Sequence, residues 1–254
     1  MNSRYSVALN GVGMASIHQD LYIADIQCNN EQKNDVTFSS ANRQGAVYMK
    51  NVLSPKTVTI VFRLYIYDIN LRQTVCQMVN KWAMNGGILT TNDRAGQKLS
   101  VVPGQYAVIP SAMKWTDDLT ITFTAPFPYW EQSAAATVTV ADSAVHDLLI
   151  PGNVPQAEQG ALVDATATLT ASADTLAIRC DSNVITLNGL AGTTGDVIRF
   201  YHDDNRFLHI EKNGTSILGK RSGADDLTAQ SGGTSIFMVT GPASVVFEVR
   251  GLWR

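Results

Sequence analysis

The chain has 254 residues, of which 45% are hydrophobic and 16% charged, and this composition excludes a disordered protein. Nineteen Lys and Arg against 22 Asp and Glu give a net charge of −3. A pI of about 5.8 does not fit the basic surface that nucleic-acid binding needs, which excludes nucleic acid as the main partner. The apolar stretches are shorter than the roughly 20 residues of a bilayer crossing and the first residues do not form a secretory signal, so we expect a soluble protein made in a cytoplasm, with no membrane partner.

The three cysteines do not indicate a shared covalent or metal site. Cys28, Cys76 and Cys180 are far apart and odd in number. A disulfide framework or a four-ligand zinc site needs cysteines in closer and complete sets. We expect each cysteine to fill core space as a small apolar side chain.

A polar segment, residues 25–52, is the first distinct stretch of the chain. It contains the polar run 29–35 and then alternates weakly, with Phe38, Tyr48 and Met49 among its apolar residues. A loop of this length inside a compact domain is uncommon unless it has a function, such as reaching a neighbouring subunit. The sequence leaves two alternatives open, an arm of that kind and a floppy insertion.

A long strand and one helix follow this segment. Residues 57–67 alternate with period two and are rich in branched and aromatic side chains, which predicts a strand with one face in a core. Apolar residues at helical spacing predict a helix over residues 71–84, with Asn70 as its N-cap and Gly86-Gly87 after its end.

Short strands complete the first half of the chain. We predict them over residues 88–89, 98–102, 105–109 and 119–123, with Pro103-Gly104 as a hairpin turn. The first half is therefore predicted to be a β-barrel or β-sandwich domain with one packed helix.

Charge and composition change near residue 133. Residues 1–132 carry 11 basic and 9 acidic side chains, a net of +2, whereas residues 133–254 carry 8 and 13, a net of −5. Two prolines, Pro126 and Pro128, precede this point and disfavour a regular helix or strand. The sequence thus predicts two domains, residues 1–132 and residues 133–254.

The second half is predicted to be a β-sandwich without a helix. Short alternating segments lie at 165–169, 176–178, 184–187, 197–201, 207–210, 236–239 and 245–252. Turn residues separate them, for example Asn188-Gly189 and Asn213-Gly214. Seven or more such strands are typical of a sandwich.

Patterns of catalytic chemistry are missing from the sequence. It has no Gly-x-Ser-x-Gly turn for a serine nucleophile, and its glycine-rich turns lack the Gly-Lys-Ser/Thr ending of a phosphate loop. Adjacent carboxylates such as Asp117-Asp118 on a strand would point to opposite faces, so a solvated turn is the favoured interpretation. We expect a binding or assembly protein with no catalytic residues, no cofactor and no metal.

The densest polar cluster runs from His202 to Asn205 and is followed by His209 and Glu211. Imidazole and carboxylate groups can ligate a metal or bind a sugar. Asp and Asn between two strands also suit a tight hairpin turn. The turn is the favoured interpretation, and the metal site and the sugar site are the alternatives.

The order of these features resembles the distal tail proteins of long-tailed, non-contractile bacteriophages. The resemblance comprises the strand at 57–67, the helix ending at Trp82, the threonine-rich strand at 119–123 and the closing run Pro126-Phe127-Pro128-Tyr129-Trp130. The second half is similar to the galectin-like sandwich of the same proteins, most clearly at residues 185–198.

This resemblance implies a structural virion protein at the phage tail tip, assembled in the host cytoplasm. It implies a hexameric ring, single or stacked, that joins the tail tube protein to tail-tip or baseplate components, with DNA only in passage through the channel. In this family the position of residues 25–52 holds a long hairpin or belt that reaches the neighbouring subunit. We therefore expect Phe38, Tyr48 and Met49 to contact a neighbour in the ring.

The alternative function is a carbohydrate-binding module that contacts the host cell wall. Lectin-type sites stack an aromatic side chain against the sugar ring. Trp253 is the only tryptophan of the second half and is expected to pack in the sandwich, which removes the best candidate for that role.

Overall fold

The computed structural model describes residues 3–29, 33–39, 46–109, 117–156 and 158–254, with only the backbone of residues 33–39 and 46–52. The chain divides into two compact units. The first, unit 1, is Met1–Trp130 together with Arg254, and the second, unit 2, is Glu131–Trp253. The chain passes from one unit to the other within the short strand β10 (Trp130–Gln132).

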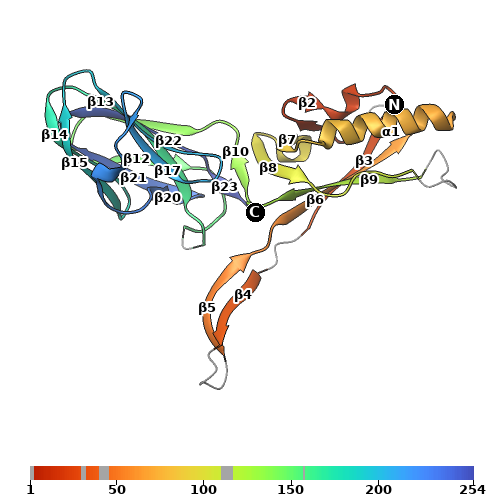
Figure 1. Cartoon of the computed structure of the whole chain (residues 1–254), viewed down its shortest axis with the longest axis horizontal. Helices are drawn as coiled ribbons and strands as arrows, with labels where there is room; N and C mark the ends of the chain where they lie inside the picture. The colour runs from red at the N-terminus through yellow and green to blue at the C-terminus, as the bar shows by residue number, and fades with distance from the viewer. Residues whose placement is uncertain (1–2, 30–32, 40–45, 110–116, 157) are drawn as a thin grey trace. The chain divides into compact units, whose positions relative to one another are not determined.

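Unit 1 is an antiparallel β structure with one α-helix lying along its sheet (Figure 1). The strands of the sheet follow the order β2-β1-β7-β8-β9-β6-β3. Their bounds are β1 (Val7–Leu9), β2 (Val12–Gly13), β3 (Leu21–Cys28), β6 (Lys56–Leu64), β7 (Gly87–Thr91), β8 (Gln97–Pro103) and β9 (Leu119–Ala125). The helix is α1 (Ile69–Ala83), and two 3-10 turns, η1 (Met14–Ser16) and η2 (Asn92–Arg94), connect strands.

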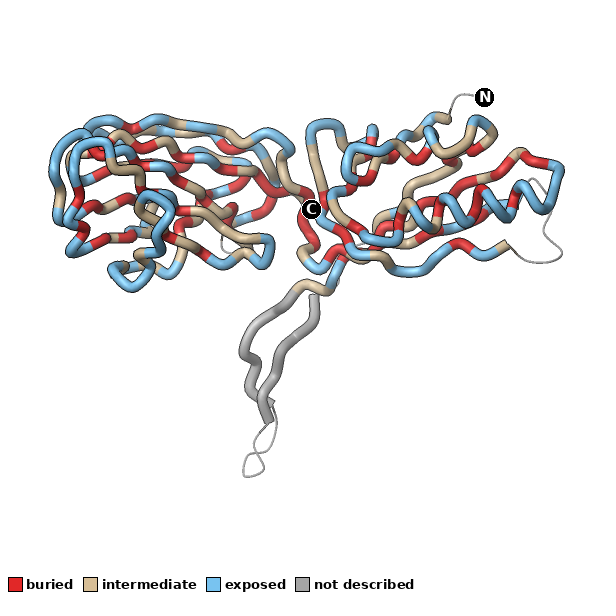
Figure 2. The backbone as a smooth tube through the Cα atoms, turned by 45° about the horizontal axis from the view of Figure 1, so that its top comes forward, coloured by how far each residue is buried: buried red, intermediate tan, exposed pale blue. Residues whose placement is uncertain are grey.

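The core of unit 1 follows from the alternation of β6 and β9. Val58 lies opposite Phe123 and Ile60 opposite Ile121 in the antiparallel register, and all four side chains are buried. Trp82 of α1 packs edge-on against Phe123, with 6.0 Å between ring centroids. Figure 2 shows this alternation as buried steps separated by intermediate or exposed steps along these strands. The period-two pattern therefore placed this strand correctly, although β6 ends at Leu64 and not at residue 67.

Helix α1 begins earlier than the sequence predicted. The Asp68 carboxylate accepts hydrogen bonds from the backbone N–H groups of Asn70, at 2.8 Å, and Leu71, at 3.4 Å. Asp68 is therefore the N-cap, and the prediction of Asn70 was wrong. Asp and Asn both suit an N-cap. The first buried residue of α1 is Arg72, only a few positions after both Asp68 and Asn70, so the burial pattern does not decide between the two candidates.

The predicted strand at 105–109 and its hairpin turn at Pro103-Gly104 were also wrong. β8 pairs with β7 and β9, and the chain beyond Pro103 keeps its direction along β9. The N–H of Gly104 donates to the Thr122 carbonyl oxygen and the N–H of Thr122 to the Gln105 carbonyl oxygen, both at 2.9 Å. Because the chain does not reverse at Gly104, residues 105–109 cannot return along β8.

Residues 33–39 and 46–53, all but the last of them in the polar segment, form a two-stranded antiparallel sheet. Strand β4 (Lys33–Ser39) pairs with β5 (Ala46–Leu53), and neither pairs with another strand among the described residues. The hairpin connects β3 and β6, which are neighbours in the sheet (Figure 1). The two strands pair regularly with each other, and whether they form an arm that reaches a neighbouring subunit stays a prediction.

Unit 2 is a sandwich of two antiparallel sheets. One sheet has the order β11-β22-β13-β16-β17-β18, with β20 paired to β13, and the other has the order β12-β21-β14-β15-β19. The bounds are β11 (Ala136–Val140), β12 (His146–Ile150), β13 (Ala161–Leu169), β14 (Ala173–Cys180), β15 (Asn183–Gly192), β16 (Val197–His202), β17 (Leu208–Lys212), β18 (Thr215–Ser216), η3 (Leu218–Lys220), β19 (Arg221–Gly223), β20 (Thr228–Ala229), β21 (Gly233–Thr240), β22 (Ala243–Val249) and β23 (Leu252–Trp253).

Apolar side chains from both sheets meet inside unit 2. Phe237 of β21 and Phe247 of β22 belong to different sheets, are fully buried and lie 4.9 Å apart between ring centroids. Phe200 of β16 is buried in the same way. The predicted fold class, mainly β with one α-helix in the first unit and a β-sandwich in the second, is confirmed for the described residues.

The turn predictions in unit 2 had mixed outcomes. Asn213 and Gly214, with φ values of 49° and 82°, connect β17 to β18 as predicted. Asn188-Gly189 is not a turn, because both residues lie within β15, where the pairing with β14 is irregular between Ala173 and Thr175. A bulge and a turn both favour glycine at positive φ, so the dipeptide alone does not separate them.

Candidate assembly surfaces

The β4–β5 hairpin carries the three residues predicted to contact a neighbour. Phe38 of β4 lies opposite Val47, and Tyr48 of β5 lies opposite Thr37. Met49 is the extra residue at a register shift, because the next pair joins Val36 to Lys50. The structure brings all three onto one hairpin, and their side chains lie outside the described residues.

One face of the unit 1 sheet is lined with threonine. Along β6 and β9 the side chains that alternate with the core residues point to the opposite face, and cross-strand pairs join Thr57 to Thr124 and Thr59 to Thr122. With Thr120, these five residues define the threonine face, and all are partly or fully exposed.

Charge on the threonine face is compensated locally. Arg63, on the same side of β6, donates from Nε to the Asp118 carboxylate at 2.6 Å. Asp118 lies just before β9, in the pair Asp117-Asp118 that the sequence predicted as a solvated turn. Its carboxylate neutralises the charge of Arg63. The face therefore presents hydroxyl groups and a paired cation rather than free positive charge.

Helix α1 exposes apolar side chains along the border of its buried face. Leu71 and Met78 are seven residues apart, which places them on one side of a helix, and they are 43% and 46% exposed. Trp82 follows on the same side and donates from Nε1 to the carbonyl oxygen of Val12, whose side chain is 53% exposed. We name these four residues the outer stripe. Exposed apolar groups gathered in this way are typical of a surface that contacts another protein.

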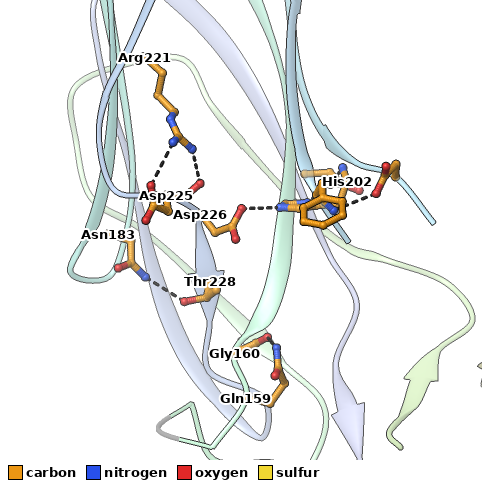
Figure 3. Close-up of polar contacts among 11 residues, drawn as sticks. Gln159, Gly160, Asn183, His202, Arg221, Asp225, Asp226 and Thr228 are labelled. Carbon is orange, nitrogen blue, oxygen red and sulfur yellow. Dashed lines mark hydrogen bonds and ion pairs between the residues drawn. The ribbon is translucent and has the colours of Figure 1, made fainter. Parts of the chain in front are cut away.

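His202 is the centre of a polar cluster in unit 2 (Figure 3). Its Nδ1 lies 2.8 Å from the Asp164 carboxylate of β13, and its Nε2 lies 3.2 Å from the Asp226 carboxylate, between β19 and β20. Nearby, Arg221 pairs with Asp225 at 3.0 Å. Asp164 and Asp226 were not among the sequence candidates, because they are 38 and 24 residues away from His202 in the chain.

The rest of the predicted polar cluster is divided between a turn and a sheet face. Asp203 accepts the N–H groups of Asn205 and Phe207 at 3.0 and 2.9 Å, which confirms the tight turn after β16. These bonds lower the pKa of Asp203, with the Phe207 N–H as the largest cause. Within the described residues, no group of three or more His, Cys, Asp or Glu side chains is arranged to hold a metal ion.

Two further predicted residues, His209 and Glu211, lie on β17 beside β16. His209 stacks on Tyr201 with 5.3 Å between ring centroids, and Arg199 lies 5.6 Å from the Tyr201 centroid. Glu211 accepts a hydrogen bond from the Tyr201 hydroxyl at 2.7 Å, which raises the pKa of Tyr201. The Tyr201 ring is thus engaged with side chains of β16 and β17.

In the part of the chain that the structure describes, no helix combines the length and hydropathy needed to cross a membrane. Trp253, the tryptophan weighed for sugar binding, lies on β23 and is half-buried.

Comparison with known proteins gives matches in structure but not in sequence. No protein-family model and no curated protein sequence matches the chain. The crystal structure of the Dit protein (gp 19.1) of phage SPP1, described as a paradigm of the hub adsorption apparatus in phages that infect Gram-positive bacteria, matches with a TM-score of 0.71 and 11% identity. The match covers 97% of this chain and 98% of that one. The chain therefore has the fold of SPP1 Dit over nearly its whole length.

The baseplate of phage P2 in its activated conformation also gives matches. The structure with Ca matches with a TM-score of 0.47 and 9% identity over 99% of this chain and 98% of that one. The structure with Sr matches with a TM-score of 0.47 and 8% identity over 97% of both chains.

Proposed function

We propose that the protein is a structural hub at the tip of a phage tail, a virion component without enzymatic activity. The observation that carries this proposal is the fold likeness to SPP1 Dit, which extends over 97% of the chain and thus over both units. A β-sandwich alone would say little, because that architecture serves many functions. Two different units in the same order are a much rarer combination.

The hub is proposed to be a hexameric ring, alone or stacked on a second ring. A closed ring is built from head-to-tail interfaces, so each copy needs two different surfaces. Unit 1 offers two such surfaces, the outer stripe of α1 and the β4–β5 hairpin. This supports unit 1 as the ring-forming unit and unit 2 as the galectin-like domain outside the ring.

The β4–β5 hairpin is proposed to reach the neighbouring copy. An isolated two-stranded hairpin is at best marginally stable in water, and its free edges can add to another sheet through main-chain hydrogen bonds. Phe38, Tyr48 and Met49 are the proposed contact residues of this arm.

The threonine face is proposed to line the channel through which DNA passes. A wall with free Lys and Arg would bind phosphates and slow the passage of the duplex. The hydroxyl groups of Thr57, Thr59 and Thr122 carry no charge, and Arg63 is already paired with Asp118. The tail tube protein and the tail-tip or baseplate components are the proposed partners at the two ends of the ring.

Light scattering and negative-stain imaging of the purified protein test the proposal. We expect particles with sixfold symmetry and a mass of about six times the 27.5 kDa subunit, or a multiple of this for stacked rings. The proposal would be overturned if the protein remained at the subunit mass at every concentration and antibodies failed to locate it at a phage tail tip. A solitary subunit that binds cell-wall glycans would favour the carbohydrate-binding alternative.

A further inference from the structure

His202 connects two separate parts of unit 2 through its two ring nitrogens. Asp164 belongs to β13, in the same sheet as His202, whereas Asp226 belongs to the segment 224–227 between β19 and β20. The His202 side chain is only 5% exposed, and the two carboxylates are 30% and 39% exposed. Figure 3 shows the contact from Asp226 to the imidazole.

The chemistry of these groups makes the double contact depend on a proton. An ionised carboxylate only accepts hydrogen bonds, and a neutral imidazole has one N–H group to donate. Only the doubly protonated ring can donate to Asp164 and Asp226 together. Without the proton, one bare ring nitrogen faces a carboxylate oxygen.

The contact to Asp226 is the weaker of the two. Asp164 also accepts the backbone N–H of His202 at 3.0 Å, and its contact with Nδ1 is shorter, at 2.8 Å against 3.2 Å for Nε2 and Asp226. A single remaining N–H group therefore stays on Nδ1 and bonds Asp164. Deprotonation of the ring breaks the hydrogen bond that reaches the segment 224–227.

We propose that His202 is a proton-controlled latch that holds the segment 224–227 against the sandwich. When both ring nitrogens carry a proton, the imidazolium ties this segment to β13 and β16. When one proton is lost, the imidazole keeps Asp164 and releases Asp226, so the segment opens more often.

Other charged groups lie around the latch. Asp225 pairs with Arg221 of β19 at 3.0 Å, and Asp203, in the turn after β16, lies 3.4 Å from Nε2 of His209. Glu248 of β22 lies opposite Asp164 in the register. The two contacts of the imidazole itself are therefore the pH-sensitive link between the sheet and the segment.

Two backbone hydrogen bonds report whether the segment is closed. The N–H of Ala224 donates to the Val184 carbonyl oxygen at 2.8 Å, and the N–H of Val163 donates to the Leu227 carbonyl oxygen at 3.0 Å. Hydrogen exchange of these two amides in the full-length protein follows the opening of the segment. Amides in the centre of β21 serve as an internal reference for global unfolding.

The experiment follows exchange at a series of pH values across the range in which the protein stays folded, after correction for intrinsic exchange rates. We expect the Ala224 and Val163 amides to be at least about tenfold more protected at the acidic end of the series than at the basic end, because a hydrogen bond between charged groups is broken when the ring loses its second proton. Protection that stays equal across the whole series would overturn the proposal.

Matched variants separate the latch from a general effect of pH. In Asp226→Asn the carboxamide can donate to an unprotonated Nε2, so protection should no longer depend on pH. His209→Gln, which changes a neighbouring histidine outside the latch, should keep the pH dependence of the wild type. A pH dependence that persists in Asp226→Asn, or disappears in His209→Gln, contradicts the role of His202.

Discussion

Asn80 and Ala107 exchange two hydrogen bonds across 27 residues of chain. The Asn80 side-chain amide donates to the Ala107 carbonyl oxygen at 2.9 Å, and its carbonyl oxygen accepts the Ala107 N–H at 3.0 Å. The side chain of Asn80 thus supplies the same hydrogen-bond donor and acceptor that the backbone of a neighbouring strand would supply. These two bonds attach the segment 104–109, which is not a strand, to helix α1.

Replacing Asn80 by Ala should therefore lower the free energy of unfolding by about 1–3 kcal/mol, because it removes two hydrogen bonds from the buried backbone of Ala107. Chemical denaturation monitored by circular dichroism measures the change. Gln77→Ala, at an exposed position of the same helix, should stay within about 0.5 kcal/mol of the wild type. Equal stability of Asn80→Ala and Gln77→Ala would show that the Asn80 pair does not stabilise the fold.

Gly251 packs against the backbone of the segment after β12. A Cβ atom at this position would overlap the carbonyl oxygen of Pro151, and backbone cannot move aside as a flexible side chain can. We expect Gly251→Ala to destabilise unit 2 by about 1–3 kcal/mol or more. Thermal unfolding would measure the loss.

Gly219 is the matched control for Gly251, because a Cβ atom there would have no neighbour within 4 Å. Gly219→Ala should change stability little. A Gly251→Ala protein that unfolds at the same temperature as Gly219→Ala would contradict the close backbone contact.

The three free cysteines should differ in reactivity. Burial raises the pKa of the Cys180 thiol strongly, and burial also raises the pKa values of Cys28 and Cys76. Cys28 is half-buried, whereas Cys76 and Cys180 are buried. Because thiolate is the reactive form, iodoacetamide should label Cys28 first in the native protein and reach Cys180 only on unfolding.

Mass spectrometry of tryptic peptides reads this order directly. Cys28→Ser should remove the early label and leave the slow ones unchanged. Rapid native labelling of Cys180 would mean that its environment is open to solvent.

The sequence predicted those parts of the fold that a local pattern specifies. β6 and β9 show a period-two pattern because one face of each strand enters the core, and α1 repeats its apolar residues at helical spacing. The N-cap was misplaced because Asp68 and Asn70 are both good capping residues two positions apart. The segment 105–109 was misassigned because its alternation resembles a strand, whereas its partner is the side chain of Asn80.

The candidate site was less predictable for a physical reason. The turn at residues 203–207 could be read from the tolerance of Asp and Asn for tight backbone angles. The two partners of His202 could not, because the folded topology brings Asp164 and Asp226 to it from 38 and 24 residues away. The pairing of β4 with β5 was likewise unresolved, since its weak alternation fitted both a hairpin arm and an irregular insertion.

Asp196 should make the stability of unit 2 sensitive to acid. Its carboxylate accepts the N–H of Thr193, pairs with Lys212 at 2.9 Å and accepts from the Asn213 side chain, and these contacts, led by the Thr193 N–H, hold its pKa far below the usual range. A lowered pKa in the folded state stabilises the fold above the unfolded-state pKa of about 3.9, and this contribution is lost as pH falls through the folded-state value.

Asp196→Asn should therefore be less stable than the wild type at neutral pH, with the difference narrowing progressively below about pH 4. Urea unfolding at a series of pH values measures it. Asp174→Asn, at a carboxylate with one long hydrogen bond of 3.5 Å to Ala191, provides a comparison with little expected effect. A wild-type advantage over Asp196→Asn that grows as the pH is lowered would have the wrong sign for this account.

The outer stripe of α1 should control assembly without controlling folding. Met78 is 46% exposed and Leu71 is 43% exposed, so Lys at either position can remain solvated in the free subunit. Within an interface the same Lys would have to lose its water without gaining a partner, a cost of about 3–5 kcal/mol for a buried unpaired charge. Met78→Lys and Leu71→Lys should therefore shift the protein from assembled rings toward single subunits while its unfolding temperature stays nearly unchanged.

Light scattering at a series of protein concentrations gives the assembled fraction, and circular dichroism gives the unfolding temperature. Gln77→Lys adds the same charge next to Met78 in the sequence but about 100° away around the helix, outside the outer stripe. It should assemble as the wild type does. If Met78→Lys and Gln77→Lys assemble equally well, the outer stripe does not face a neighbouring subunit, and the second surface of the ring must be sought elsewhere on unit 1.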